Sequence, residues 1–113
     1  MCLRKIYIYD LQPSDLPRRR SLDYFEEAEE REINRDGLPQ VWDTPKGVII
    51  SDGNNRVYWK SLQGKSYVLV DFQRLDPRMS FILEDVLEGA EVMRQRGIHS
   101  VADICEDDVV ITL

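Results

Sequence analysis

The sequence predicts a single small α+β domain in which helices pack on one mixed sheet. Its 113 residues are enough for one domain. Strand-like segments alternate with segments of helical periodicity, in the order β-α-β-β-α-β-α-β. Hydrophobic residues make up 42% of the chain and charged residues 32%, a balance typical of folded proteins. A chain of this length can form one hydrophobic core without disulfide bonds.

The N-terminal third predicts a strand, a loop and a helix. Residues 5–9 alternate β-branched and aromatic side chains, which is typical of a strand. Residues 10–17 contain two prolines and predict a loop. Ser21 is a candidate N-cap for a helix that extends to about Arg35 and stops at Gly37. The apolar face of this helix is thin, so its glutamates are expected to face water.

The middle of the chain predicts three more strands and a second helix. Residues 38–42 and 47–51 predict two short strands joined by a hairpin-like turn that contains Pro45. Residues 54–63 have the spacing of a helix with one apolar face. Residues 66–72 form a nearly continuous apolar strand, which we expect to be central in the sheet.

The C-terminal part predicts a long helix, a short helical turn and a last strand. Asp76 followed by Pro77 is a strong helix start, and this helix is expected to extend to Gly97. Ser100 opens a capping box, and residues 108–112 predict the strand. The long helix has an apolar stripe that is expected to pack on the sheet or to serve self-association. Its residues are Met79, Ile82, Leu83, Val86, Ala90 and Met93.

The net charge of −6 disfavours tight binding to duplex DNA, which draws on Lys and Arg contacts to phosphates. Acidic residues gather at Glu26–Glu32 and Glu106–Asp108, and basic residues at Arg18–Arg20. The acidic turn at 106–108 matches no calcium-loop spacing, so no metal site is predicted.

A cytoplasmic protein is expected, because no apolar run approaches the length of a membrane span and the N-terminus lacks a signal region. The two cysteines, Cys2 and Cys105, do not form a disulfide framework. Acidic neighbours disfavour a reactive Cys105 thiolate, and we expect this side chain to be buried. His99 is the only histidine, and we expect it to have a loop or capping role.

The segment that carries chemistry is Asp52, Gly53, Asn54, Asn55 and Arg56. A buried strand is expected to end at Asp52 and a helix to begin directly after Gly53. Free amides at such a helix start attract anions, and the Arg56 guanidinium matches a phosphate or carboxylate. The same residues also suit ordinary turn chemistry, in which Asp52 or Asn54 only caps the helix.

This segment resembles the "DGHHR" or "GERR" box of ParB-like domains and the "GGCHR" box of sulfiredoxins. Other features resemble the ParB/sulfiredoxin-like (ParB N-terminal-like nuclease) family in the same order, over roughly residues 5–72. These are Ile8–Pro13, which resembles the opening strand and "I-x-P" turn; Pro17-Arg18, which resembles "N-P-R"; Gly37–Gln40, which resembles the step into the next strand; and Gly64 with Tyr67–Val70, which resembles the closing "G…VPVIV".

The resemblance implies that the box holds the phosphates of a nucleotide, such as a nucleoside triphosphate with Mg²⁺. Gly53, Asn54, Asn55 and Arg56 would contact this ligand together with Asp52, and Arg18 is a further candidate. Asn54 stands where sulfiredoxins carry a cysteine, so reduction of sulfinic acids is not expected. Asparagines do not titrate, so no general base is expected in the box.

Two functions follow from this sequence. The first is a ParB-like domain that binds a nucleotide or phosphate and has at most weak phosphoryl-transfer or hydrolytic activity, for which Asp52 is the candidate metal or water ligand. The second is a non-enzymatic interaction or regulatory module, in which the box is structural and the acidic helix at Glu26–Glu32 contacts a basic partner. A homodimer is also compatible with the apolar stripe. Residues 73–113 form a C-terminal extension that lies outside the resemblance.

Overall fold

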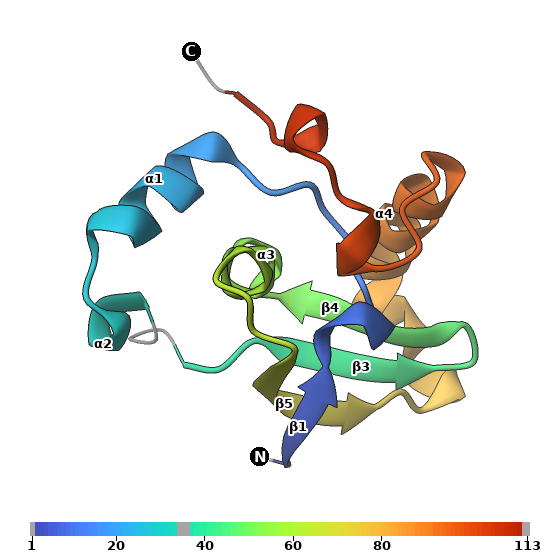
Figure 1. The fold of residues 1–113 in the computed structure, drawn as a ribbon. Coiled ribbons are helices and arrows are strands. Elements are labelled where there is room, and N and C mark those ends of the chain that lie inside the picture. Colours follow the sequence, from blue (N-terminus) through green and yellow to red (C-terminus); the bar gives the residue numbers. More distant parts are fainter. Residues whose placement is uncertain (1, 34–36, 112–113) are drawn as a thin grey trace.

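The computed structural model describes residues 2–33 and 37–111, in which one sheet has helices on both faces (Figure 1). The elements in chain order are β1 (Leu3–Tyr7), the 3-10 turn η1 (Ile8–Asp10), β2 (Leu11–Gln12), α1 (Arg19–Glu27), α2 (Glu30–Ile33), β3 (Gln40–Thr44), β4 (Gly47–Asp52), α3 (Asn54–Leu62), β5 (Tyr67–Arg74), η2 (Pro77–Leu83), α4 (Glu84–Gln95), η3 (Val101–Asp103) and η4 (Glu106–Asp108). Within these described ranges, no helix has the length and apolar character needed to span a membrane.

The five strands lie in the order β1-β5-β3-β4-β2. β1 pairs antiparallel with β5 and β3 with β4, whereas β3 with β5 and β2 with β4 are parallel pairs. This arrangement confirms the predicted α+β fold with one mixed sheet. β5 has strands on both sides, as predicted, although its alternate side chains Tyr67 and Leu69 are exposed.

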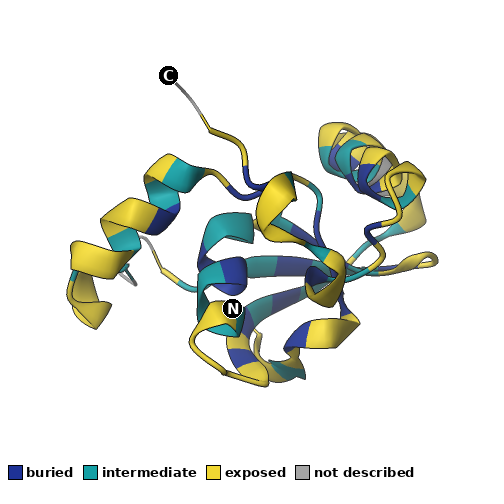
Figure 2. Cartoon of the chain, turned by 45° about the horizontal axis from the view of Figure 1, so that its top comes forward, coloured by how far each residue is buried: buried dark blue, intermediate teal, exposed yellow. Residues whose placement is uncertain are grey.

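One face of the sheet forms the main core with α3. Val41, Ile50 and Val70 of adjacent strands belong to one buried cluster with Val57 and Tyr58 of α3. Figure 2 shows buried segments on the strands at the centre of the sheet. Burial of a valine-sized side chain contributes about 1.5 kcal/mol or more. The apolar face predicted for residues 54–63 therefore anchors α3 on the sheet.

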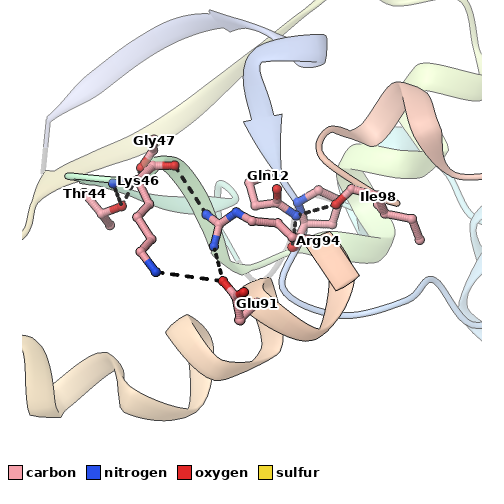
Figure 3. A network of polar contacts seen from close by, with 8 residues as sticks. Gln12, Thr44, Lys46, Gly47, Glu91, Arg94 and Ile98 are labelled. Atoms are coloured by element: carbon pink, nitrogen blue, oxygen red, sulfur yellow. Dashed lines mark hydrogen bonds and ion pairs between the residues drawn. The ribbon is translucent and has the colours of Figure 1, made fainter. Parts of the chain in front are cut away.

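The segment after β5 completes the core on both faces of the sheet. Val101 of η3 and Val109 belong to the same buried cluster as α3. On the opposite face, Leu87 of α4 and Ile49 of β4 line one small apolar cavity. The buried Gln12 side chain donates to the carbonyl of Ile98, at 3.0 Å, and so joins β2 to the chain after α4 (Figure 3).

Polar contacts fasten α4 to the β3–β4 turn (Figure 3). The Arg94 guanidinium donates to the Lys46 carbonyl and to Glu91, each at 3.3 Å, and the Lys46 ammonium lies 3.9 Å from the same carboxylate. Exposed ion pairs of this kind contribute at most about 1 kcal/mol each. They orient α4, and apolar contacts supply most of the binding to the sheet.

The first strand begins and ends two residues earlier than predicted, and the predicted loop contains a strand. β1 spans Leu3–Tyr7 rather than 5–9, and β2 lies within the predicted loop at 10–17. The Ile8 amide donates to the Ser66 carbonyl, after which the chain turns so that Ile8 and Leu11 are both fully buried. Burying both side chains breaks the period-two alternation on which the strand prediction rested.

The predicted strand 38–42 is also displaced, and β3 spans Gln40–Thr44. The Thr44 hydroxyl donates to the Gly47 carbonyl at 2.8 Å and accepts the Lys46 amide at 3.1 Å. These bonds close the turn within fewer residues than expected, so the strand continues through Thr44.

The predicted helix from Ser21 to Arg35 is two helices. α1 begins at Arg19 and ends at Glu27, because Ala28 is extended with φ −83° and ψ 149°, and α2 follows at Glu30. Glutamates at 26, 27, 29 and 30 place like charges three and four residues apart, which disfavours one continuous helix. Arg35 lies outside the described residues.

The long C-terminal helix is also divided. Asp76 accepts the Arg78 amide and caps the start, as predicted, but Pro77–Leu83 is a 3-10 turn that precedes α4. Of the predicted apolar stripe, Leu83, Ala90 and Met93 are buried, whereas Ile82 is 56% exposed and the side chain of Met79 lies outside the described part. The 3-10 turn changes the helical period and rotates Ile82 away from the core.

The capping box at Ser100 is confirmed, but the predicted strand at 108–112 is wrong. Residues Glu106–Asp108 form η4, and Asp108 accepts the Cys105 amide at 2.8 Å. Among residues 108–111, the part of the predicted strand that the structure describes, Val110 makes a single parallel bridge with Arg18, and Thr112 lies outside the described residues. This turn holds Cys105 at the surface, so the expectation that Cys105 is buried is also wrong.

At Gly89, the backbone of α4 closely approaches the N-terminal segment. A Cβ atom at Gly89 would lie 2.3 Å from the Ser14 carbonyl oxygen. Replacing glycine by alanine within a helix normally stabilises it by up to about 1 kcal/mol. We predict that Gly89→Ala instead lowers the free energy of unfolding by about 1 to 3 kcal/mol, because overpacking displaces the backbone.

Urea unfolding followed by circular dichroism measures this change. Glu88→Ala, on the exposed neighbour of Gly89 in the same helix, is the control and should alter stability by no more than about 0.5 kcal/mol. A Gly89→Ala protein as stable as the wild type would contradict the close contact.

Candidate functional site

The box lies where β4 passes into α3, as predicted. β4 ends at Asp52, α3 begins at Asn54, and Gly53 between them has φ 94°, in the left-handed region. A Cβ atom at Gly53 would lie 3.0 Å from both Pro39 and the Arg56 guanidinium. Glycine is required here by its backbone conformation and by this close packing.

The Asn54 side chain is bonded to the N-terminal segment. Its Oδ1 accepts the Ser14 amide at 3.0 Å, and its Nδ2 donates to the Ser14 hydroxyl at 3.1 Å. The same hydroxyl donates to the Ile50 carbonyl at 2.5 Å. Asn54 therefore joins Ser14 to the start of α3, and both ends of its amide are engaged.

Asn55 makes a similar bond further along the same segment. Its Oδ1 accepts the Arg18 amide at 2.7 Å. The structure thus brings Arg18 to the box, but through its backbone, because its guanidinium lies 3.8 Å from Asp15 and is exposed. The side chains of Asn54 and Asn55 hold residues 14–18 against α3.

Arg56 is the buried charge of the box and is 7% exposed. Its Nη1 donates to the Gly37 carbonyl, and its Nη2 lies 3.3 Å from the Asp52 carboxylate. A buried guanidinium needs such partners, since an unpaired charge would be strongly destabilising. The structure therefore places all six predicted residues around one corner. The side chains of Asn54, Asn55 and Arg56 are engaged there by protein groups, whereas the Arg18 guanidinium points away to Asp15.

A pocket of about 290 Å³ adjoins the box. Asp52, Gly53, Asn55 and Arg56 line it from one side. Tyr24, Phe25, Glu32 and Ile33 of α1 and α2 line the other side. Of the residues that line the pocket, Glu32 and Asp52 are acidic, and the basic residue, Arg56, is already paired with Asp52. The electrostatics of the pocket therefore do not strongly favour an anion in the present arrangement.

A larger groove, of about 610 Å³, lies between the α1–α2 segment and the edge formed by α3 and β5. Phe25 and Trp59 face it with ring centroids 6.2 Å apart. Glu26 and Glu30 line one side and Lys60 and Lys65 the other. Burial, with a further contribution from Arg56, lowers the pKa of Lys60. We call this space the arm groove.

Residues 21–33, which we call the acidic arm, form one wall of the arm groove. Within this arm only Leu22 is buried, at 1% exposure. The arm contains six acidic residues and a single basic one, Arg31, which pairs with Glu29 at 2.8 Å. All six carboxylates are exposed: Asp23, Glu26, Glu27, Glu29, Glu30 and Glu32.

The sequence indicated one wall of the arm groove, the acidic run at Glu26–Glu32, but not the groove itself. Trp59 on the opposite wall is far from the arm in sequence. Only the fold places Phe25 beside Trp59. The break at Ala28 separates α2 from α1. The like charges at 26–30 disfavour a continuous helix, but they do not give the position of the break.

The other candidates have structural roles. His99 is exposed, and its amide donates to the Asp103 carboxylate at 2.9 Å, as part of the capping predicted there. Within the described part of the chain, no group of three or more His, Cys, Asp or Glu residues is placed to hold a metal ion. Trp42 and Trp59 are partly buried.

No family model matches the chain, and no curated protein matches it. Among solved structures, protein Atu1540 from Agrobacterium tumefaciens is similar in fold, with a TM-score of 0.52 and 22% sequence identity. The match covers 87% of this chain and 50% of Atu1540, so the present chain spans half the length of that protein. At this level of identity the likeness shows the fold alone.

The bonds of Asn54 predict a measurable contribution to stability. Asn54→Ala leaves the part-buried Ser14 amide without a partner and should lower the free energy of unfolding by about 1 to 3 kcal/mol. Asn54→Asp keeps the acceptor and places a negative charge at a helix start, so it should lose less. Chemical denaturation of each variant measures both effects.

Asn55→Ala is the matched control, because its bond to the Arg18 amide lies in an exposed position where water can replace it. Its free energy of unfolding should fall clearly less than that of Asn54→Ala. Equal losses of stability in the two variants would mean that the Ser14 contact contributes no more than the exposed Arg18 contact.

Proposed function

We propose that this domain is a non-enzymatic protein-interaction module whose acidic arm binds a basic segment of a partner protein. The observation that carries the proposal is a dense set of exposed carboxylates beside the open arm groove. Six acidic residues and one basic residue within residues 21–33 create a strongly negative local field. Such a field attracts a basic partner and speeds its association.

The internal bonds of the box support this reading over a catalytic one. Asn54 and Asn55 bind backbone groups of residues 14–18, and Arg56 binds Asp52 and Gly37. In these positions the side chains hold the corner together, which is the structural role anticipated for the box in an interaction module.

The proposed site of action is the cytoplasm. Cys2 and Cys105 are both exposed and free, as is usual for thiols in a reducing compartment.

Neutralising the arm should remove binding of basic peptides. We predict that wild-type protein binds a lysine-rich peptide more tightly than a glutamate-rich peptide of equal length. We also predict that Glu26→Gln, Glu27→Gln and Glu30→Gln combined weaken this binding by about tenfold or more, since each charge pair at a rim contributes up to about 1 kcal/mol. Trp59 fluorescence or calorimetry at low salt measures the affinity, which should fall as salt rises.

A matched triple variant on surfaces away from the arm is the control. Glu84→Gln, Glu88→Gln and Asp107→Asn change the net charge by the same amount at exposed positions. If both triple variants weaken binding equally, the attraction is due to net charge and not to the arm.

A phosphate-bearing ligand at the box is the second candidate function, and it is the one implied by the resemblance to ParB/sulfiredoxin-like domains. The observation that favours it is the pocket of about 290 Å³ that the box lines together with the arm. A phosphate there would compete with Asp52 for the Arg56 guanidinium, 3.3 Å away. The ligand would be a nucleoside triphosphate with Mg²⁺ or a simpler phosphate.

Removing the competing carboxylate tests this candidate. The Asp52 side chain is 71% exposed, whereas that of Arg56 is 9% exposed, so Asp52→Asn frees the guanidinium with little loss of burial. We predict that inorganic phosphate or a nucleoside triphosphate with Mg²⁺ raises the melting temperature of Asp52→Asn more than that of the wild type. Ligand at about 100 times its Kd adds roughly 2.7 kcal/mol, which corresponds to a rise of several degrees.

Asp107→Asn, at an exposed site remote from the box, is the control for the lost charge. An unchanged melting temperature with every phosphate compound, in both the wild type and Asp52→Asn, would remove this candidate and leave the interaction module.

A further inference from the structure

The arm groove has a strand edge as its floor. In the antiparallel β1–β5 pair, the Phe72 amide donates to the Cys2 carbonyl and the Ile8 amide donates to the Ser66 carbonyl. Because hydrogen-bonded pairs alternate along such a ladder, the backbone groups of Val68 and Val70 also point toward β1. Those of Tyr67 and Leu69 point to the other side of β5.

β3 pairs with this second edge of β5 only from Asp71 onward. Its register with β5 begins at Gln40 opposite Asp71, and the Asp71 amide donates to the Pro39 carbonyl. Tyr67 and Leu69 lie before this point, and both line the arm groove. Among the described residues, 2–33 and 37–111, no backbone partner is assigned to the amides and carbonyls of Tyr67 and Leu69 on this side.

We propose that the partner segment binds in the arm groove as an extended strand, adding to β5 alongside Tyr67 and Leu69, with its basic side chains over the acidic arm. This inference rests on the proposed function, because it specifies the conformation of the basic partner. Addition of a strand to a sheet edge obtains affinity from main-chain hydrogen bonds, and side-chain pockets supply the specificity.

The lining of the groove indicates the side chains that such a strand should carry. Phe25 of the arm and Trp59 of α3 offer apolar surface from the two walls, and Glu26 and Glu30 lie on the arm side. Lys60 and Lys65 stand on the opposite wall and balance these two carboxylates, so the excess negative charge comes from the rest of the arm. An extended segment of alternating apolar and basic residues matches both features, since its side chains point alternately to opposite sides.

Peptides with blocked backbone amides test this inference. The probe is a short capped peptide in which lysine and valine alternate, together with a set in which one amide at a time is N-methylated. We expect methylation at every second position to weaken binding by about fivefold, because each hydrogen bond contributes about 1 kcal/mol net. Methylation at the intervening positions should have a clearly smaller effect.

Amide hydrogen exchange of the protein supplies the second measurement. In the free protein, we expect the amides of Tyr67 and Leu69 to exchange faster than those of Val68 and Val70, and to become protected when the peptide binds. Equal protection of all four amides in the free protein would contradict the inference that this edge of β5 is free. Binding that is insensitive to the position of methylation would overturn strand addition while leaving the interaction module in place. A peptide that does not bind at all, together with fast exchange at Leu69, would overturn the proposed function itself.

Discussion

Ser14 links the N-terminal segment to β4, α3 and α4 at a single point. Ser14 gives its amide to Asn54 and its hydroxyl to the Ile50 carbonyl, so one residue joins the N-terminal segment to both β4 and α3. Its own carbonyl lies against Gly89 of α4, where only glycine leaves enough room. Helices on opposite faces of the sheet are thereby positioned through the same short segment.

This constraint explains why a sequence segment that suits ligand binding acts as a fastening in the structure. Side-chain amides and a guanidinium can bind a phosphate or the protein's own polar groups, and a side chain that is held by internal bonds is not free to turn toward a ligand. In this chain Asn54, Asn55 and Arg56 bind groups supplied by residues distant in sequence. The surface available to a partner is consequently displaced from the box toward the arm and the exposed half of β5.

The acidic arm and the arm groove each have a feature that is unfavourable in an isolated domain. Like charges crowd the arm, with Leu22 as its one buried residue, and the helix breaks at Ala28. Beside it, the first half of β5 has one free edge among the described residues, and free strand edges readily pair with other chains. Both features raise the free energy of the isolated domain, and a basic, extended partner would relieve both.

Local backbone preferences and apolar periodicity were enough to predict the fold class, the position of α3 after Gly53, the cap at Asp76 and the capping box at Ser100. Long-range contacts, by contrast, set the end of β1, the position of the break in the first helix and the single bridge that Val110 makes. The same kind of contact selects the partners of the box side chains and brings Phe25 to Trp59 across the arm groove. These outcomes depend on contacts between residues far apart in the chain, and the energies of such contacts cannot be derived from a local sequence pattern.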